Sequence, residues 1–375
     1  MRILYFFTFG YSLQTWEKSG TLLKELKLYQ ELYNNYNIET LFITYGDEKD
    51  CEIINEFNGL SVIPINKYLK KFDNKFISII QSFFIPIYLK FNFDLKFEII
   101  KQNQLLGSWV SILTKIIFRK PLIIRSGYDM LFFATKEKKS KLKIIGYYWL
   151  TYFSLLFANI YTVTTKQDKE YLSKKFNMNW KVKIIPNWVF TKDNPKLLEK
   201  RKNCFLTVGR LESQKNYIQL VENLSDFQYE IDIVGEGSLK KEISEIAEKI
   251  GVQVNFLGNY KYFELLKVYE NYKFFILPST FEGNPKVILE AMSLGCIVFA
   301  NNIPHHKEII NNKVNGILFD FATQNLNLFI EEVCLNKKLI KTISSNAIKS
   351  IKENNSLEKI MKLTLEDINF LVNKN

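Results

Sequence analysis

Hydrophobic residues in this chain come in short bursts that alternate with longer amphipathic stretches. Each burst ends at Gly, Pro or Ser, which predicts a strand, a loop and a helix repeated along the chain. In the first half the predicted strands are 2–9, 39–45, 121–125 and 160–164. In the second half they are 204–208, 229–234, 252–257 and 274–277, with helices from Asn216 and over 238–250. Such alternation is typical of parallel sheets covered by helices.

The length of 375 residues suits two domains of this kind. A polar, Lys-rich segment at 191–203 contains Pro195 and separates the two series of strands. We therefore expect a first domain at 1–190, a linker at 191–203 and a second domain at 204–355.

The chain is basic, with 51 Lys and Arg against 39 Asp and Glu and a formal net charge of +12. Such a charge suggests nucleic acid or an anionic membrane as a partner. Arg is rare, however, and a Lys-rich surface also arises from composition alone. We expect composition to explain most of the charge, a real basic patch to explain the rest, and no nucleic-acid partner.

The cysteines Cys51, Cys204, Cys296 and Cys334 are scattered, without the paired spacing of a zinc site or a redox motif. Reduced thiols in a cytoplasmic protein are the simplest interpretation.

The apolar run at 1–10 is too short for a signal peptide and lacks a cleavage site, so it predicts a buried first strand.

Two apolar segments raise the question of a membrane. The segment 76–89 is too short to span a bilayer, and polar residues interrupt the longer uncharged segment 144–165. Five lysines between 136 and 143 precede a run of aromatic residues, which predicts a helix at an anionic interface over 136–158. The protein would then lie peripherally on the inner face of the plasma membrane. A core helix with a solvated basic start is the alternative.

One segment places two carboxylates at a spacing that lets both face one ligand. Asn284 is a good N-cap, Pro285 suits the first helical position, and Gly295 predicts the end of the helix. Glu282 then lies in the loop before the helix, and Glu290 lies in its second turn among apolar residues. A buried carboxylate needs polar partners such as sugar hydroxyls. The alternative is a Glu at the solvent edge of an ordinary helix.

A second candidate site follows the predicted strand that ends at Val208. Ligands bind beyond the carboxyl ends of parallel strands, where Gly209 allows close approach and Arg210 offers a planar fork for phosphate oxygens. Lys215 adds a second positive charge. The alternative is a surface cation neutralised by Glu212. The later Gly235-Glu236-Gly237 is not a dinucleotide fingerprint, because Lys240 occupies the position of the third Gly.

These motifs in order resemble the retaining glycosyltransferases of family four, the group 1 glycosyltransferases. The matching segments are 185–187, 208–210 with 215–216, 234–237, 256–258, 277–279 and 282–291. The resemblance covers about 160–320. It implies an α/β protein of the GT-B fold, in which two Rossmann-like domains with parallel sheets face a cleft and a final helix over 356–372 packs back on the first domain.

The resemblance also implies roles for individual residues. Arg210 and Lys215 should hold the diphosphate of a nucleotide-sugar donor, and Glu282 should contact its sugar, so these three are the expected catalytic residues. The expected donor-binding residues are Gly10, Gly209, Gly258, Asn259, Tyr260, Gly283, Asn284, Pro285, Lys286 and Glu290. Glu290 should bind the ribose. We expect a UDP- or GDP-linked sugar as donor, with no metal and no other cofactor.

The chain departs from this family in one respect. Many members carry a His in the first domain after the strand that here ends at Arg125, whereas this chain has only His305 and His306. Arg125, Tyr128 and Asp129 are therefore the candidates on the sugar or acceptor side.

The sequence predicts sugar transfer, with retention, from a nucleotide-diphosphate donor to a glycan or lipid-linked acceptor in cell-surface polysaccharide synthesis. Two alternatives stay open: a nucleotide-sugar epimerase of the same fold, and a non-catalytic basic protein that binds membrane or nucleic acid. The affinity of such a binding protein for a polyanion would fall steeply with salt concentration, and the protein would show no preference among nucleotides.

Overall fold

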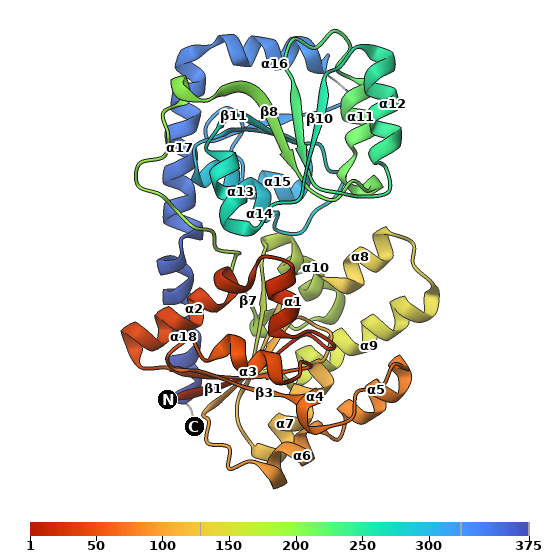
Figure 1. Ribbon diagram of the computed structural model, residues 1–375. Coiled ribbons are helices and arrows are strands. Elements are labelled where there is room, and N and C mark those ends of the chain that lie inside the picture. Colours follow the sequence, from red (N-terminus) through yellow and green to blue (C-terminus); the bar gives the residue numbers. More distant parts are fainter. Residues whose placement is uncertain (128, 323–324, 374–375) are drawn as a thin grey trace. The chain divides into compact units, whose positions relative to one another are not determined.

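The structure is a computed structural model that describes residues 1–127, 129–322 and 325–373. The chain forms two compact units, Met1–Ile185 together with Met361–Asn375, and Pro186–Ile360 (Figure 1). Each is built on one parallel sheet. The predicted α/β class with two Rossmann-like domains is therefore confirmed.

The first unit has a seven-stranded sheet in the order β3-β2-β1-β4-β5-β6-β7. Its strands are β1 (Arg2–Phe6), β2 (Glu39–Thr44), β3 (Leu60–Pro64), β4 (Ile99–Asn103), β5 (Leu122–Ser126), β6 (Ile160–Val163) and β7 (Val182–Ile184). Its helices are α1 (Leu13–Lys18), α2 (Leu22–Tyr36), α3 (Glu48–Ile54), α4 (Ile65–Tyr68), α5 (Lys75–Ser82), α6 (Ile85–Asn92), α7 (Ser108–Phe118), α8 (Met130–Lys136), α9 (Lys141–Phe157), α10 (Lys166–Phe176) and η1 (Asn179–Lys181).

The strand order of this sheet reverses between β1 and β4, which makes the adjacent loops a topological switch point where ligands bind in open sheets. The loops after the two strands are joined there, because Phe9 N donates to Leu106 O at 3.0 Å. Leu4, Ile100 and Ile124 share one apolar core. Strands buried on both faces are expected to be apolar throughout, which explains the bursts in the sequence.

The second unit has a six-stranded sheet in the order β10-β9-β8-β11-β12-β13. Its strands are β8 (Lys202–Val208), β9 (Ile231–Val234), β10 (Val254–Gly258), β11 (Tyr272–Leu277), β12 (Ile297–Asn301) and β13 (Ile317–Phe319). Its helices are η2 (Leu198–Lys200), η3 (Ser213–Lys215), α11 (Tyr217–Glu222), α12 (Lys240–Ile250), α13 (Tyr262–Tyr269), α14 (Lys286–Ser293), α15 (Pro304–Lys307), α16 (Leu326–Leu335) and α17 (Lys337–Asn355). The order reverses between β8 and β11, so the switch point lies beside the loop that follows Val208.

The boundary between the units lies at Ile185 and Pro186, before the linker expected at 191–203. Residues 191–203 belong to the second unit because they are bonded to it. Lys192 Nζ pairs with Glu270 at 2.8 Å, and Lys196 Nζ donates to Asn271 Oδ1 at 2.9 Å. The polar composition of 191–203 suggested a linker, but these polar side chains form ion pairs and hydrogen bonds within the second unit.

The last helix, α18 (Leu357–Val372), corresponds to the helix expected over 356–372. Its residues from Met361 onward belong to the first unit, where Asp367 forms an ion pair with Lys183 of β7. The chain thus returns to the unit in which it began.

The apolar segment 144–165 is divided between α9 and β6. Asn159 lies between them and joins β5, accepting from Leu122 N at 3.0 Å through its side chain and donating to Leu122 O at 2.9 Å. Across the described ranges, the helices are too short or too polar to cross a bilayer.

Candidate functional site

Three loops meet at the carboxyl ends of β8, β9 and β10. Gly209 N donates to Val234 O at 3.0 Å, and Gly235 N donates to Gly258 O at 2.8 Å. Leu211 N donates to Glu236 O at 3.0 Å. Because these strands are parallel neighbours, their loops form one edge at which ligands bind in open sheets.

The glycines of these loops are required by close backbone packing. A Cβ on Gly235 would lie 2.0 Å from Gly209 O, and one on Gly237 would lie 2.4 Å from Leu211 O. The glycines at 235 and 237 therefore allow two loops to pack closely. This packing role agrees with the prediction that the motif is not a dinucleotide fingerprint. At Gly209 a Cβ would lie 3.0 Å from Lys215 Cε, so this Gly leaves room for the lysine side chain.

Lys215 and Glu282 form the central ion pair of the site. Lys215 Nζ lies 2.6 Å from Glu282 Oε1, and the two side chains are 14% and 10% exposed. Gln214 fixes their two loops, since its side chain donates to Phe281 O at 2.9 Å and its carbonyl accepts from Thr280 N at 3.0 Å. Both residues were predicted to be catalytic from the sequence, but their pairing was not predicted.

Arg210 follows β8 with an exposed side chain. Glu212, the residue suspected of neutralising it, instead accepts from Ser238 N at 3.2 Å and from Ser238 Oγ at 3.0 Å. These hydrogen bonds lower the pKa of Glu212 more than the charge of Arg210 does. Within the described part of the chain Arg210 forms no ion pair, so its guanidinium is available to an anionic ligand.

The helix that carries Glu290 begins later than predicted. α14 starts at Lys286 with Pro285 as its N-cap, so Asn284 is not the cap. Asn284 is engaged elsewhere, because its Oδ1 accepts from Asn187 N at 3.4 Å and its carbonyl accepts from Asn187 Nδ2 at 3.0 Å. Gly295, with φ +76°, follows the helix end as predicted.

Asn187 is a site residue whose role the sequence analysis missed. It holds the 283–285 loop through Asn284, and its carbonyl accepts from Asn355 Nδ2 at 2.8 Å. A motif at 185–187 was recognised in the sequence, but its partner lies 97 residues further along the chain. Only the fold brings the two together.

Glu290 is buried, at 4% exposure, on α14. Tyr269 Oη donates to Glu290 Oε2 at 3.4 Å, which supplies one of the polar partners that a buried carboxylate requires. Burial raises the pKa of Tyr269, so the phenol keeps its proton for this bond. Gly283 and Lys286, on the same segment, are partly exposed.

Gly258, Asn259 and Tyr260 follow β10 at the same edge of the sheet. Gly258 has φ +70° and turns the chain, and Asn259 and Tyr260 are exposed. The 39% exposed Tyr260 ring offers a surface on which a planar base can stack.

His306 of α15 is a second residue to which the sequence analysis gave no role. It is fully buried, its Nδ1 lies 2.8 Å from Asn301 O, and its Nε2 has no hydrogen-bond partner in the described ranges. Burial lowers the pKa of His306 to about 4, against opposing contributions from Asn301 and Glu282. Lys215 lowers it further. A neutral imidazole therefore lies close enough to the Lys215–Glu282 pair to interact with it electrostatically. The sequence feature that could have pointed to His306 is its position shortly after a buried strand.

Of the site residues expected in the first unit, one lines a cavity and two form hydrogen bonds within the unit. Gly10 has φ +80° with open space beside it, and it lines a cavity of about 770 Å³. Arg125 donates to Ile185 O at 3.1 Å, and Asp129 caps α8 by accepting from Phe132 N at 2.8 Å. Burial raises the pKa of Asp129 to about 6. Tyr128 lies outside the described residues.

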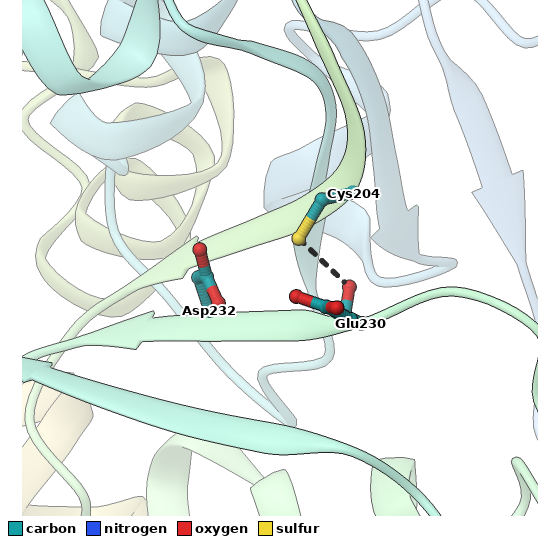
Figure 2. A group of neighbouring side chains, drawn as sticks. All are labelled: Cys204, Glu230 and Asp232. Carbon is teal, nitrogen blue, oxygen red and sulfur yellow. Dashed lines mark hydrogen bonds between the residues drawn. The ribbon is translucent and has the colours of Figure 1, made fainter.

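Among the described residues, one group of three side chains is spaced closely enough to hold a metal ion: Cys204, Glu230 and Asp232. Figure 2 shows the Cys204 thiol directed at Glu230, whose carbonyl accepts from it at 3.1 Å. Burial raises the pKa of Cys204 to about 12, and Asp232 already accepts from Asn255 at 2.9 Å and from Tyr272. The side chains of this group are already hydrogen-bonded, and they lie toward the amino ends of β8 and β9, away from the loops that carry the other candidate residues.

Comparisons with known proteins agree with this geometry. Residues 189–350 match the family described as glycosyl transferases group 1. An Escherichia coli UDP-Gal:alpha-D-GlcNAc-diphosphoundecaprenol alpha-1,3-galactosyltransferase is 27% identical over 280 residues, which is 68% of this chain and 70% of the relative. A Campylobacter jejuni alpha-1,4-N-acetyl-D-galactosaminyltransferase, whose name specifies an undecaprenol-linked diphosphate acceptor, is 24% identical over 68% of both chains.

A solved structure extends the comparison to the whole fold. Anabaena HepE in complex with UDP and glucose has a TM-score of 0.75 and 18% identity, covering 99% of this chain and 100% of that chain. The resemblance drawn from the ordered motifs is thus confirmed. The chain has the GT-B fold, and its residues 189–350 match the group 1 glycosyltransferase family.

Proposed function

We propose that this protein transfers a sugar from a nucleoside-diphosphate donor to a lipid-linked glycan, with retention of the anomeric configuration, in cell-surface polysaccharide synthesis. The observation that carries the proposal is the sheltered Lys215–Glu282 pair at 2.6 Å, together with the exposed Arg210 of the same loop as Lys215, which forms no ion pair in the described ranges. The E. coli and C. jejuni relatives support the acceptor class, because both names specify undecaprenol-linked diphosphates.

In this proposal Arg210 and Lys215 bind the diphosphate. The bond between the anomeric carbon and the diphosphate oxygen breaks, and its electron pair leaves with the diphosphate. Two fixed cations stabilise that developing negative charge, so the reaction needs no metal. The acceptor hydroxyl forms the new bond on the face that the diphosphate leaves, and its proton passes to the departing diphosphate.

Glu282 has two tasks in this scheme. Its Oε1 neutralises and positions Lys215 before the donor arrives, so little reorganisation is required during reaction. In the same scheme its other oxygen accepts from a hydroxyl of the donor sugar. Glu290 accepts from the ribose hydroxyls, and Asn259 and Tyr260 contact the base. We propose a UDP-linked donor, which the E. coli relative's name specifies and the HepE structure's UDP supports.

The cavity of the first unit is the proposed site for the acceptor. It contains the cationic side chains of Lys18, Lys71 and Lys75, which suit a diphosphate. Ser12, Gln14, Asn66 and Gln81 also line it and offer hydrogen bonds to a glycan. We place the reaction on the cytoplasmic face of the plasma membrane, in agreement with the four free thiols.

Thermal unfolding with UDP-, GDP-, ADP- and CMP-sugars tests the donor site. Ligand at about 100 Kd stabilises a protein by roughly 2.7 kcal/mol, and we expect that shift with a UDP-sugar in the wild type and its loss in Glu290→Ala. A variant that retained the shift would contradict the donor assignment.

Product analysis then tests the reaction itself. Incubation with donor and an undecaprenol-diphosphate glycan should release UDP and extend the glycan by one sugar. The same donor incubated alone would give a C2- or C4-epimer if the protein were an epimerase. Shifts of equal size with all nucleotides and no product would indicate a non-catalytic binding protein, an alternative that the relatives do not favour.

A further inference from the structure

The helices α5 and α6, drawn in orange in Figure 1, carry several large apolar side chains that are exposed. Phe76 is 69% exposed, Phe84 60% and Phe91 79%, whereas Ser82 is 1% exposed. A helix in water normally buries its apolar stripe and exposes its serines. On α5 the arrangement is the reverse, since Ser82 is the residue that this helix buries, so the outward apolar face requires an explanation.

The exposed residues form one stripe along the two helices. The members that are more than a third exposed are Phe76, Ile77, Ile79, Ile80, Phe83, Phe84, Ile87 and Phe91. Most are three or four residues apart, which places them on one helical face. An apolar patch of this kind marks an interaction site.

The core of the first unit holds this stripe in its orientation. Trp109 of α7 donates to Ser82 Oγ at 2.8 Å and stacks on Phe83 with ring centroids 6.2 Å apart. On α6, Ile85 and Leu89 are buried in the apolar core. The segment is thus anchored on its inner side, and the outward face belongs to the folded unit.

The charges around the stripe identify the kind of partner. The segment 74–93 contains no Asp or Glu, although Asp73 and Asp94 flank it, and the cations in or beside it outnumber these two acids: Lys70, Lys71, Lys75, Lys90 and Lys96. An anionic lipid surface attracts such lysines while apolar side chains enter the boundary between headgroups and acyl chains. A second copy of this chain is a poorer partner, because a symmetric contact would bring the same lysines together.

A second basic and aromatic segment packs on the same helix. Ser154 Oγ of α9 donates to Ser108 Oγ of α7 at 2.8 Å. α9 begins within the lysine cluster at 136–143 and exposes Leu142 at 83% and Trp149 at 51%. The interface predicted from sequence over 136–158 and the stripe of α5 and α6 thus share one support, α7.

We propose that the outward face of α5 and α6 docks this protein on an anionic bilayer, with the lysines before and in α9 as a second contact. Lys75, Ser78 and Gln81 of the same α5 line the first-unit cavity. Docking would therefore bring that cavity to the surface where a lipid-linked head group lies. The proposal stands on surface chemistry alone and does not require the glycosyl-transfer function.

Sedimentation of the full chain with vesicles tests the proposal, without nucleotide. We compare vesicles of phosphatidylglycerol and phosphatidylethanolamine with vesicles of phosphatidylcholine alone. The wild type should bind the anionic vesicles, less at high salt, and Phe76→Ser with Phe84→Ser should lower the partition coefficient about tenfold. Leu328→Ser with Leu335→Ser is the matched control, because these leucines of α16 are 63% and 77% exposed in the second unit.

The outcomes separate the proposal from its competitors. Unchanged thermal unfolding and an unchanged shift with UDP-sugar would show that the Phe variant is folded. A wild type that stays in the supernatant, or a Phe variant that binds as the wild type does, overturns the proposal. A dimeric wild type that the Phe substitutions convert to monomer, with no vesicle binding, would assign the face to a second copy and also overturn it.

Discussion

Lys215 Nζ lies 2.6 Å from Glu282 Oε1, in a part of the second unit where both side chains are at least 86% buried, being 14% and 10% exposed. The two charges come from loops 67 residues apart that follow different strands. Removing one member leaves the other charge without its partner, which costs far more than losing a surface ion pair.

We expect Lys215→Met to destabilise the second unit by roughly 3 kcal/mol and to lower kcat/KM by about 10²- to 10³-fold. Lys192→Met is the control, since Lys192 pairs with Glu270 at 2.8 Å but is 54% exposed, and it should cost less than about 1 kcal/mol. Denaturant unfolding and steady-state kinetics measure both effects. Adding Glu282→Gln to Lys215→Met should cost less than the sum of the single changes, and additivity would contradict the pairing.

Asn187→Ala should loosen the 283–285 loop, because the side chain and backbone of Asn187 hold Asn284. The loss of a partially buried hydrogen bond is worth about 1 kcal/mol, so KM for the donor should rise about fivefold. Asn346→Ala is the control, since Asn346 of α17 is also partly buried and also donates to a carbonyl, that of Val314, at 2.9 Å, but this hydrogen bond is exposed and lies outside the candidate site. Equal effects on KM would remove Asn187 from the site.

His306 should make stability depend on pH in acid. Its pKa is about 4 in the folded protein against 6.5 for the free side chain, so the unfolded chain binds more protons between those values. The free energy of unfolding therefore falls as the pH drops from about 6.5 to about 4, by up to roughly 3 kcal/mol. His306→Gln should show a flatter profile than the wild type in denaturant titrations across that window, and parallel profiles would refute the assignment.

Asp129 should give the opposite pH dependence, so that its contribution to the free energy of unfolding falls as the pH rises. Its pKa is raised from 3.8 to about 6, so the folded protein binds more protons between those values and loses stability as the pH rises through them. Asp129→Asn keeps an N-cap for Phe132 N and removes the titration. The variant should gain stability relative to wild type at neutral pH but not near pH 4, by up to roughly 3 kcal/mol. An equal difference at both pH values would count against this role.

The sequence predicted most of the strands because strands buried on both faces leave a continuous apolar signal. The strand expected over 39–45 is β2, Glu39–Thr44, and that expected over 160–164 is β6, Ile160–Val163. Local signals were less reliable where a side chain finds a distant partner. Asn284 has the chemistry of an N-cap, yet its bonds to Asn187 leave the capping position to Pro285.

The sequence also could not predict contacts between residues that are far apart along the chain. The motifs named Lys215 and Glu282 individually, but no periodicity relates residues 67 positions apart. The segment 76–89 was recognised as apolar and too short to span a bilayer, and its pattern does not reveal which side faces outward. That side is decided by Trp109, which takes Ser82 and Phe83 as its partners and so turns Phe76 and Phe84 to solvent.

The outward aromatic stripe of α5 and α6 has a kinetic consequence. Docked as proposed, the protein would search for the proposed lipid-linked acceptor by diffusion in two dimensions, where the local concentration of that acceptor is high. The first unit then needs only weak intrinsic affinity for the acceptor's head group. A water-soluble analogue lacking the polyprenyl chain would gain nothing from this confinement, and it would saturate the enzyme only at much higher bulk concentrations.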